Sequence, residues 1–344
     1  MTSANEPHSK TINVSVITTC YGRNRHLYNL LSSLANGSMR PQEVIIVNDD
    51  ADPEHLAQYP LHIVQVPTAQ ADLIANSQQG AVSKNKNTAK KTGFDIGYNR
   101  NLGAAKASHE ALIFLDVDCI VSTTFIEQLT AKLQAYPDAL LMGQPLYLTR
   151  PLTATESLQL QQSDLSNAEL NAFAVTNPYR HNLVKKAVEQ ASKIASDTLN
   201  KNHKDMERTQ DYGAFWSLCF AISQTQFQRL GGFDTHYVGY GAEDTDFAFM
   251  ARALDIEFYL TDDVVYHQQH SVYRPPLNHL ASIVINANRF YDKWQHWPMG
   301  GWLEEFAQMQ IIDWDAQQQT PIAIIRQPSV SEIEAAYCAD APYV

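Results

Sequence analysis

The sequence predicts an α/β fold with a mostly parallel central sheet flanked by helices. The first observation is a strand–helix–strand pattern: residues 11–19 are rich in β-branched side chains, residues 26–34 carry leucines at helical spacing, and residues 43–47 are apolar. This order gives a parallel pair of strands joined by a right-handed crossover. The second observation is the unbroken apolar run 111–115. It is typical of a strand buried on both faces of a parallel sheet, although a buried helix segment has the same pattern.

The remaining elements follow the same logic along the chain. Apolar runs predict strands at 62–66, 139–148, 215–222, 257–260 and 264–266, and helical spacing predicts helices at 97–109, 122–133, 224–230, 247–254, 281–294 and 302–312. Asn36-Gly37 is expected to end the first helix with a left-handed cap. Residues 69–92 are polar and rich in lysine. We interpret them as a solvated loop, with a lid near a phosphate site as the alternative.

The chain is expected to divide near the proline pair at 275–276. Its 344 residues are enough for one large α/β domain or about two ordinary ones. We expect one domain over residues 1–270, with a largely helical, polar insertion at 150–212. Residues 271–344 are expected to form a helical C-terminal extension that packs on this domain, and an interface between copies in a homo-oligomer is the alternative.

Composition limits the classes of partner and the compartment. The formal net charge is −12 and the pI is about 5.4, which argues against a broad binding surface for nucleic acid or an anionic membrane. The four cysteines are far apart, and neither a signal-peptide pattern nor an apolar run near the ~20 residues of a membrane span is present. We expect a cytoplasmic protein without a transmembrane segment, with peripheral membrane contact as the alternative.

Two carboxylates follow the central apolar run at its carboxyl end. Asp116 and Asp118, separated by Val117, are expected to project to one side, because alternate residues of an extended chain share a face. Open α/β sheets bind ligands at this end of their strands. Close carboxylates repel unless a cation lies between them, and Mg²⁺ and Mn²⁺ prefer oxygen ligands that they share with phosphates. The pattern indicates a metal site for a phosphorylated substrate, with an acidic capping turn as the alternative.

A second acidic group begins a later helix. Gly239 and Gly241 precede the carboxylates of Glu243, Asp244 and Asp246. The dipole at a helix N-terminus favours negative charge, so helix capping explains one or two of the acids. Capping does not explain the two glycines, which permit close approach of the backbone to a neighbour.

The order and spacing of these motifs resemble the nucleotide-sugar-dependent glycosyltransferases of the GT-A fold. The first half resembles the inverting family 2, whose opening strand and turn, aspartate pair, Arg-Asn-x-Gly element and Asp-x-Asp motif match residues 14–25, 49–50, 100–103 and 116–118. Residues 231–246 resemble the Gly-Gly-Phe-Asp and Trp-Gly-Gly-Glu-Asp motifs of galactosyl- and N-acetylgalactosaminyltransferases. The architecture is similar to that of bacterial chondroitin-polymerase-like transferase domains. This resemblance implies a Rossmann-like GT-A catalytic domain over residues 1–270.

The chain departs from these motifs at three positions. Tyr240 stands where the family has tryptophan, Ala242 stands where it has the second glycine, and Asn48 precedes the aspartate pair in place of an aliphatic residue. An aromatic platform for a sugar is therefore kept, but with a different ring.

The resemblance implies metal-dependent chemistry at the Asp-x-Asp motif. The metal ligands that it implies are Asp118, His267 and Asp116, and His270 is a rival to His267. The metal is Mn²⁺ or Mg²⁺, since Mn²⁺ accepts mixed oxygen and imidazole ligands and either ion can neutralise a leaving diphosphate.

The resemblance also implies how the acceptor is activated and held. Asp244 is the implied general base, with Glu243 beside it as a second catalytic carboxylate. Tyr240, Gly241 and Asp246 are the implied acceptor-binding residues.

The implied partners are a UDP-sugar and a carbohydrate or other hydroxyl acceptor. The residues implied to bind the nucleotide-sugar are Thr18, Tyr21, Arg23, Asp49, Arg100, Asp116 and Val117. We expect an inverting transferase that moves a hexose or N-acetylhexosamine, and the galactosyl-type motif favours UDP-galactose or UDP-N-acetylgalactosamine. The alternatives are a retaining GT-A transferase and a non-catalytic nucleotide-sugar-binding protein. A sugar-nucleotide pyrophosphorylase is disfavoured because residues 20–25 lack its glycine-rich, lysine-containing loop.

Overall fold

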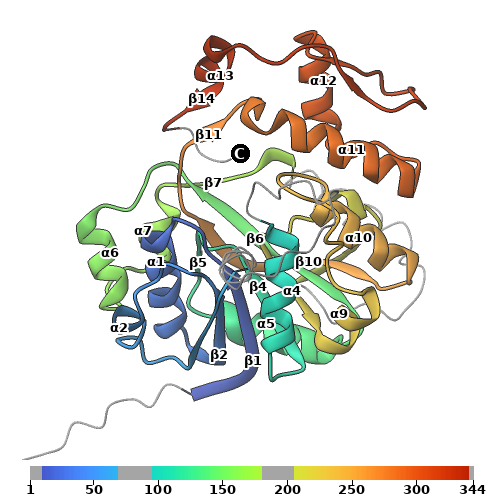
Figure 1. Ribbon diagram of the computed structural model, residues 1–344. Helices are drawn as coiled ribbons and strands as arrows, with labels where there is room; N and C mark the ends of the chain where they lie inside the picture. The colour runs from blue at the N-terminus through green and yellow to red at the C-terminus, as the bar shows by residue number, and fades with distance from the viewer. Residues whose placement is uncertain (1–9, 69–94, 180–204, 341–344) are drawn as a thin grey trace, which may run out of the picture.

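A ten-stranded sheet forms the centre of the molecule (Figure 1). The computed structural model describes residues 10–68, 95–179 and 205–340. Within them the strand order is β3-β2-β1-β4-β9-β6-β10-β5, with β7 beside β6 and β8 beside β10. The strands are β1 (Lys10–Thr19), β2 (Met39–Val47), β3 (Ile63–Val66), β4 (Ala111–Leu115), β5 (Cys119–Val121), β6 (Leu140–Leu148), β7 (Ala174–Thr176), β8 (Met206–Thr209), β9 (Cys219–Ser223) and β10 (Phe258–His267).

Helices flank this sheet and continue into the C-terminal part. The flanking helices are α1 (Asn24–Ala35), α2 (Pro53–Leu56), α4 (Ile96–Lys106), α5 (Phe125–Ala135), α6 (Ala154–Gln161), α7 (Asn167–Asn171), the short η1 (Tyr212–Ala214), α9 (Gln224–Leu230) and α10 (Glu243–Ala253). The C-terminal part contains β11 (Val272–Tyr273), η2 (Leu277–His279), α11 (Leu280–Trp294), α12 (Gly300–Gln308), β12 (Ile312–Asp313), β13 (Ala323–Ile324), α13 (Val330–Ala336) and β14 (Tyr337–Cys338).

Strand direction brings three strand ends to one edge of the sheet. β1 runs parallel to β2 and β4, and β2 runs parallel to β3. β9 is antiparallel to both β4 and β6, and β10 is parallel to β6, so β10 runs in the direction of β1 and β4. The carboxyl ends of β1, β4 and β10 therefore lie at the same edge, where α/β sheets bind ligands.

Each face of the sheet has its own apolar core. Along β4, Ile113 joins a core shared with α1 and α5, whereas Phe114 joins a core shared with α9 and α10. This alternation follows from the period of two in an extended strand. The second core is aromatic: Phe114 stacks on Phe220 with ring centroids 4.5 Å apart, and Phe233 stacks on Phe247 at 4.4 Å. These rings fix the start of α10 against the centre of the sheet.

The chain beyond residue 270 forms a helical layer, which we call the C-terminal layer. Figure 1 shows α11, α12 and α13 above the end of the sheet opposite the start of β1. The layer has a core of its own, which includes Ile283 and Phe306. Tyr240, in the loop before α10, packs against this core. The C-terminal layer therefore contacts the segment that carries the second acidic group.

Most predicted elements are confirmed. The α/β class with flanking helices and a helical C-terminal extension is confirmed, as are the strands at 11–19, 43–47 and 111–115 and the helix at 224–230. Residues 69–92 lie outside the described residues, and so does part of the insertion. The division of the chain at residue 270 and a homo-oligomer stay predictions.

The end of the first helix differs from the expectation. Asn36 has φ −99° instead of a left-handed conformation, and its N–H donates to the Ser32 carbonyl. Gly37 has no room for a side chain, because a Cβ there would lie 3.2 Å from the Met39 carbonyl oxygen and 3.4 Å from that of Thr123. The glycine permits two backbone segments to pack closely, and a sequence pattern does not distinguish this use from a cap.

The sheet contains the expected parallel strands, together with three features that the sequence did not predict. β9 lies between β4 and β6 and runs antiparallel to both. The strand predicted at 215–222 begins only at Cys219. The strands predicted at 257–260 and 264–266 are one strand, β10, whose register against β6 shifts in its middle. Such an irregularity interrupts the apolar pattern without ending the strand.

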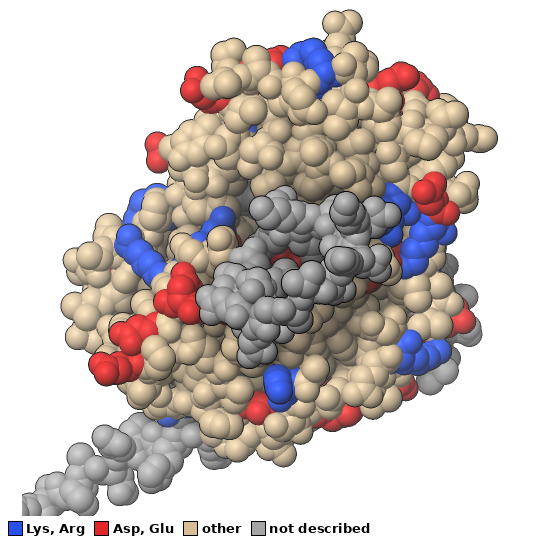
Figure 2. Space-filling view, in the orientation of Figure 1, with Lys and Arg blue, Asp and Glu red and all other residues tan. Residues whose placement is uncertain are grey.

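The surface and helix lengths add two observations. No helix within the described ranges is long and apolar enough to cross a membrane. On the face drawn in Figure 2, Lys and Arg side chains lie in small groups with Asp and Glu between them.

Two helical glycines are expected to respond in opposite ways to alanine. In α4, a Cβ on Gly103 would lie 2.5 Å from Ile17 Cγ2, so Gly103→Ala should lower the free energy of unfolding by about 1–3 kcal/mol through overpacking. In α12, a Cβ on Gly301 would meet no atom within 4 Å. Gly301→Ala should therefore raise the free energy of unfolding by roughly 0.5 kcal/mol. Urea denaturation measures both changes. A Gly103→Ala variant as stable as the unchanged protein would contradict the close packing of α4 on β1.

Candidate active site

The turn between β4 and β5 carries the predicted carboxylates to the carboxyl edge of the sheet. β5 pairs antiparallel with the end of β10, so that Cys119 lies opposite His267. The Gln268 N–H donates to the Asp118 carbonyl oxygen at 2.6 Å. This pairing fixes the backbone of Asp118 beside His267, although the two residues are far apart in the sequence.

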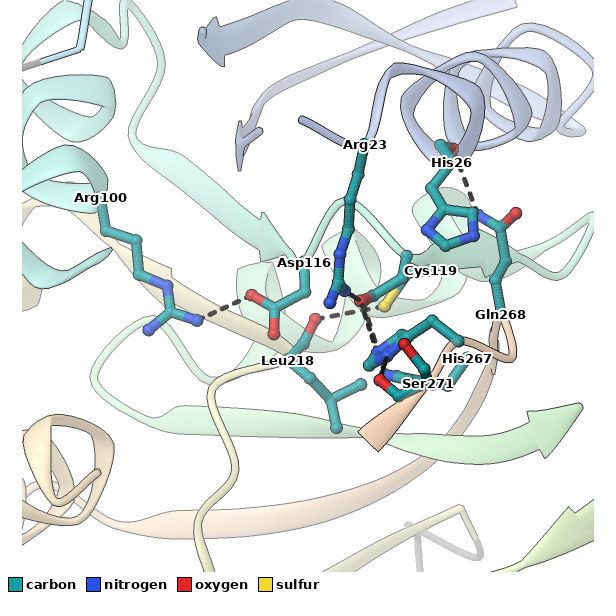
Figure 3. Close-up of polar contacts among 11 residues, drawn as sticks. Arg23, His26, Arg100, Asp116, Cys119, Leu218, His267, Gln268 and Ser271 are labelled. Carbon is teal, nitrogen blue, oxygen red and sulfur yellow. Dashed lines mark hydrogen bonds and ion pairs between the residues drawn. The ribbon is translucent and has the colours of Figure 1, made fainter. Parts of the chain in front are cut away.

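Asp118, His267 and His270 form a compact group in which each residue offers one ligand atom within 4.8 Å of the others. Nε2 of His267 lies 3.5 Å from Asp118 Oδ1, and Nε2 of His270 lies 3.3 Å from Oδ2. Nη1 of Arg23 donates to the same Oδ2 at 2.6 Å. Figure 3 shows Arg23 and His267 meeting at this point, from the start of α1 and the end of β10.

Burial and neighbouring groups set the charges of this group. Burial raises the pKa of Asp118, but His267, His270 and Arg23 outweigh burial and hold that pKa well below its usual range. Burial lowers the pKa of His267 to about 4, and Asp118 opposes this only in part. At neutral pH the carboxylate is therefore ionised and the His267 ring is neutral, which are the forms that bind metal ions.

The group fits a divalent cation. Asp118 Oδ1 is buried and accepts no hydrogen bond within the described residues, and a buried polar atom left in this state is costly. One carboxylate and two imidazoles are a donor set for a divalent first-row metal ion. The structure thus brings together Asp118, His267 and the rival His270. The third predicted ligand, Asp116, is not in this group, because its carboxylate faces Arg100.

A buried arginine connects the two acidic groups. Nη2 of Arg100 donates to Asp116 Oδ1 at 2.7 Å (Figure 3), and Nη1 lies 3.8 Å from Glu243 Oε1. The Arg100 side chain is only 4% exposed, and its guanidinium lies 5.1 Å from the centroid of the Phe233 ring. Asp116, after β4, and Glu243, at the start of α10, therefore face one fixed cation.

Glu243 and Asp244 are partly buried acids in the first turn of α10. Burial raises the pKa of Glu243 to about 7, and the charges of Asp244 and Asp116 act in the same direction. Burial also raises the pKa of Asp244, against a hydrogen bond of 2.7 Å from the Thr245 N–H. A carboxylate with a raised pKa accepts a proton more readily near neutral pH, so this pair can supply a general base.

The loop before α10 is held against α11. Gly239 and Gly241 have φ values of +82° and +98°. A Cβ on Gly239 would lie 2.7 Å from Ser282 Cβ, and a Cβ on Gly241 would lie 2.5 Å from Met299 Sδ. Nδ2 of Asn286, buried in α11, lies 3.2, 3.3 and 3.0 Å from three carbonyl oxygens of this loop, which share its two N–H donors. The two glycines thus serve contact with the C-terminal layer, and this contact positions the start of α10.

Asp246 links α10 to α11. Its side chain is 1% exposed, and it accepts hydrogen bonds from the Tyr237 hydroxyl at 3.1 Å, Lys293 Nζ at 2.9 Å and Trp294 Nε1 at 2.7 Å. These contacts give no support to the predicted role of Asp246 in acceptor binding. Sequence reasoning missed Lys293, Trp294 and the Asn286 contacts, because only the paired glycines indicated a close neighbour and nothing indicated which one.

The residues predicted to bind the nucleotide have different surroundings. Thr18 is buried at the end of β1, and its hydroxyl has no hydrogen-bond partner in the described part of the chain. Tyr21 is 61% exposed at the same edge. Asp49 accepts hydrogen bonds from both the N–H and the hydroxyl of Thr68. Val117 is buried in the core on the α1 face, so its side chain packs instead of facing a ligand.

Comparison with known sequences gives two matches. A family model described as "Glycosyltransferase like family 2" matches residues 67–275. The chain is 25% identical over 273 residues to the chondroitin synthase of Pasteurella multocida (strain Pm70), and the match covers 77% of this chain and 25% of the relative. The chain therefore spans about a quarter of the length of this curated relative.

Comparison with solved structures gives weaker likenesses. GalNAc-T7 with UDP, GalNAc and Mn²⁺ has a TM-score of 0.44 and 16% identity, over 74% of this chain and 43% of that chain. A 1–349 fragment of TarS from S. aureus in complex with UDP has a TM-score of 0.45 and 12% identity, over 81% of this chain and 66% of that chain.

Replacing Glu243 is expected to change how stability depends on pH. The pKa of Glu243 is raised to about 7 in the folded protein. The contribution of this side chain to the free energy of unfolding is therefore fully present at a pH below its pKa in the unfolded chain, and it is lost as the pH rises through about 7. From about pH 5 to about pH 8, Glu243→Gln should therefore gain up to roughly 3 kcal/mol of stability relative to the unchanged protein. Urea denaturation without added metal or nucleotide measures this.

The matched control is Glu304→Gln, on the exposed side of α12. The free energy of unfolding of this variant should follow that of the unchanged protein at both pH values. A Glu243→Gln difference that is the same at both pH values would show that the carboxylate is not destabilised by its surroundings.

Proposed function

The chain belongs to the glycosyltransferase like family 2, and we propose that it is a metal-dependent inverting transferase that moves a hexose or N-acetylhexosamine from a UDP-sugar to a glycan hydroxyl. The observation that carries the proposal is the pair of Arg100 contacts with Asp116 and Glu243. They join the turn after β4, which also carries Asp118 of the candidate metal group, to the acidic pair of α10. A transferase needs both groups, because a diphosphate must be stabilised as it leaves and an alcohol must be deprotonated as it enters.

The donor half of the proposed site lies around Asp118. Asp118, His267 and His270 would hold Mn²⁺ or Mg²⁺. When bound, this ion supplies a Lewis acid that neutralises the charge growing on the leaving diphosphate. The Arg23 side chain is 40% exposed, so its guanidinium can reach a phosphate. Nη1 of Arg100 donates no hydrogen bond within the described ranges. Its N–H groups are therefore available for a hydrogen bond to the UDP-sugar.

The acceptor half lies at the start of α10. Burial raises the pKa of both Glu243 and Asp244, which makes each carboxylate a better proton acceptor. Arg100 lies 3.8 Å from Glu243, and its charge opposes the rise in pKa of both carboxylates. Asp244 is the proposed base for the acceptor hydroxyl, because it is the last acid of the motif that implies this role. A base on the side of the sugar opposite the leaving diphosphate would favour a single displacement, which inverts the anomeric carbon.

The substrates are proposed from the motifs and the relative. The galactosyl-type motif at 231–246 supports UDP-galactose or UDP-N-acetylgalactosamine as the donor. The relative from Pasteurella multocida is named a chondroitin synthase, which supports a polysaccharide acceptor.

Asp118→Ala is expected to abolish the metal dependence of UDP binding. The unchanged protein should bind UDP more tightly with Mn²⁺ than with a chelator, by more than about tenfold, since even outer partners of metal ligands contribute that much. The variant should bind UDP equally weakly in both conditions, because it lacks the carboxylate of the metal group. Calorimetric titration measures both affinities. The control is Asp164→Asn, at an exposed position. If Asp118→Ala keeps the Mn²⁺ dependence of UDP binding, the Asp118 carboxylate is excluded as a metal ligand.

Asp244→Asn is expected to keep UDP binding in Mn²⁺ and to lose transfer by about 10²–10⁴-fold, the usual contribution of a general base. UDP release from a panel of UDP-sugars and oligosaccharide acceptors measures transfer. Asp255→Asn is the matched control, because Asp255 is exposed just after α10 and its φ of +54° suits asparagine. Near-normal turnover by Asp244→Asn would remove Asp244 as the base.

The same assay separates the alternatives. NMR of the product should show an anomeric configuration opposite to that of the donor. A retained configuration would overturn inversion and favour a retaining transferase. UDP binding without UDP release for any donor and acceptor would favour a non-catalytic nucleotide-sugar-binding protein.

A further inference from the structure

Two buried glutamines separate the two histidines of the metal group. They are Gln268 and Gln269, the inner residues of the segment His267–His270, and each is only 3% exposed. Glutamine lies mostly on protein surfaces, because burying its amide costs free energy unless the amide is hydrogen-bonded. The contacts of these two amides therefore decide what they do between the candidate ligands.

The side chain of Gln268 anchors the segment to α1. Its Oε1 accepts a hydrogen bond at 2.7 Å from Nδ2 of Asn29, which is itself 5% exposed. Its Nε2 donates to the His26 carbonyl oxygen at 3.2 Å (Figure 3). The backbone of the same residue contacts the metal group, since the Gln268 N–H donates to the Asp118 carbonyl oxygen. Gln268 therefore ties the backbone of Asp118 to α1.

The side chain of Gln269 anchors the segment to the C-terminal layer. Its Nε2 donates to the Ala339 carbonyl oxygen at 2.8 Å. Ala339 directly follows β14, which pairs antiparallel with β11. Since β10 ends at His267, His270 lies beyond the main sheet. The two glutamines thus fix the segment to two separate parts of the molecule where the strand no longer supports it.

The backbone of this segment also sets the direction of the His270 ring. Nδ1 of His270 lies 2.9 Å from the Ser271 carbonyl oxygen. A carbonyl oxygen only accepts hydrogen bonds, so Nδ1 carries a proton and Nε2 is the atom that lies 3.3 Å from Asp118 Oδ2. Histidine ligands usually have such a partner on the other ring nitrogen, which fixes the ring. A shift of the backbone after His267 would therefore move a candidate ligand atom.

We propose that Gln268 and Gln269 are positioning residues of the metal group. This inference rests on the proposed function, and it assigns the shape of the metal group to anchors that are not ligands themselves. The two amides hold the backbone between the imidazoles, so that both Nε2 atoms face Asp118 before an ion arrives. A site held in this way loses less conformational freedom when it binds an ion, so loosening the anchors weakens binding.

Mn²⁺ alone is the probe, and the EPR signal of the free ion measures its Kd on the full chain. Gln268→Met and Gln269→Met each remove an amide and keep an unbranched side chain. Each should raise the Mn²⁺ Kd by about tenfold, as expected for residues that support metal ligands. Asn29→Ala changes no residue of the metal group and should still raise this Kd by about threefold. Because Asn29 acts through Gln268, adding Asn29→Ala to Gln268→Met should change the Kd by less than about twofold.

The matched control is Gln226→Met in α9. Gln226 is 5% exposed and its Nε2 donates to Asp138 Oδ1 at 2.7 Å, so this variant also removes a buried, hydrogen-bonded amide. Urea denaturation should show a loss of stability in both Gln226→Met and Gln268→Met, but Gln226→Met should leave the Mn²⁺ Kd unchanged. If Gln268→Met does not fold, Gln269→Met and Asn29→Ala give the same test.

Two results would contradict the positioning role, and they are distinguishable. An unchanged Mn²⁺ Kd in the folded variants of Gln268, Gln269 and Asn29 would show that these amides serve stability alone, and the proposed function would stand. A chain that binds no Mn²⁺, with or without UDP, would overturn the metal dependence of the proposed function and the positioning role with it.

Discussion

The site depends on one buried arginine that holds acids from two distant parts of the chain. Arg100 pairs with Asp116 after β4 and faces Glu243 at the start of α10. Carboxylates gathered this closely repel one another, and burial already raises the pKa of Asp116, Glu243 and Asp244. A guanidinium keeps its proton at any physiological pH. Arg100 therefore stays positively charged between these acids when one of them gains or loses a proton.

A second constraint comes from the C-terminal layer. The loop that carries Tyr240 has little freedom of its own, since its two glycines leave room for α11 and the N-terminal end of α12 to approach closely. The two N–H groups of the Asn286 amide then donate to carbonyl oxygens of this loop, and Asp246 accepts hydrogen bonds from Lys293 and Trp294 of α11. The start of α10 is therefore positioned by residues that follow it in the sequence.

Family membership and structure account for different parts of this arrangement. The family match ends at residue 275, so it includes Arg100, Asp118, Glu243 and His267. It does not reach Asn286 or Trp294, whose contacts come from the tertiary structure. The chemistry expected of the family thus concerns the sheet edge and the two acidic groups. Features that could distinguish this chain from its relatives lie where the C-terminal layer meets the loop before α10.

The sequence by itself determined most of the longer strands and helices and the chemical character of the two acidic groups. Apolar periodicity, turn residues and the order of motifs are local properties that one chain records directly. Only the tertiary structure decided that Asp118 meets both His267 and His270, that Asp116 faces Arg100, and that Asp246 points inward to α11. These contacts depend on the antiparallel pairing of the three-residue β5 with β10 and on the packing of α11 against a glycine-containing loop. Strand register and helix packing between distant segments leave no local pattern, so no reading of neighbouring residues could have supplied them.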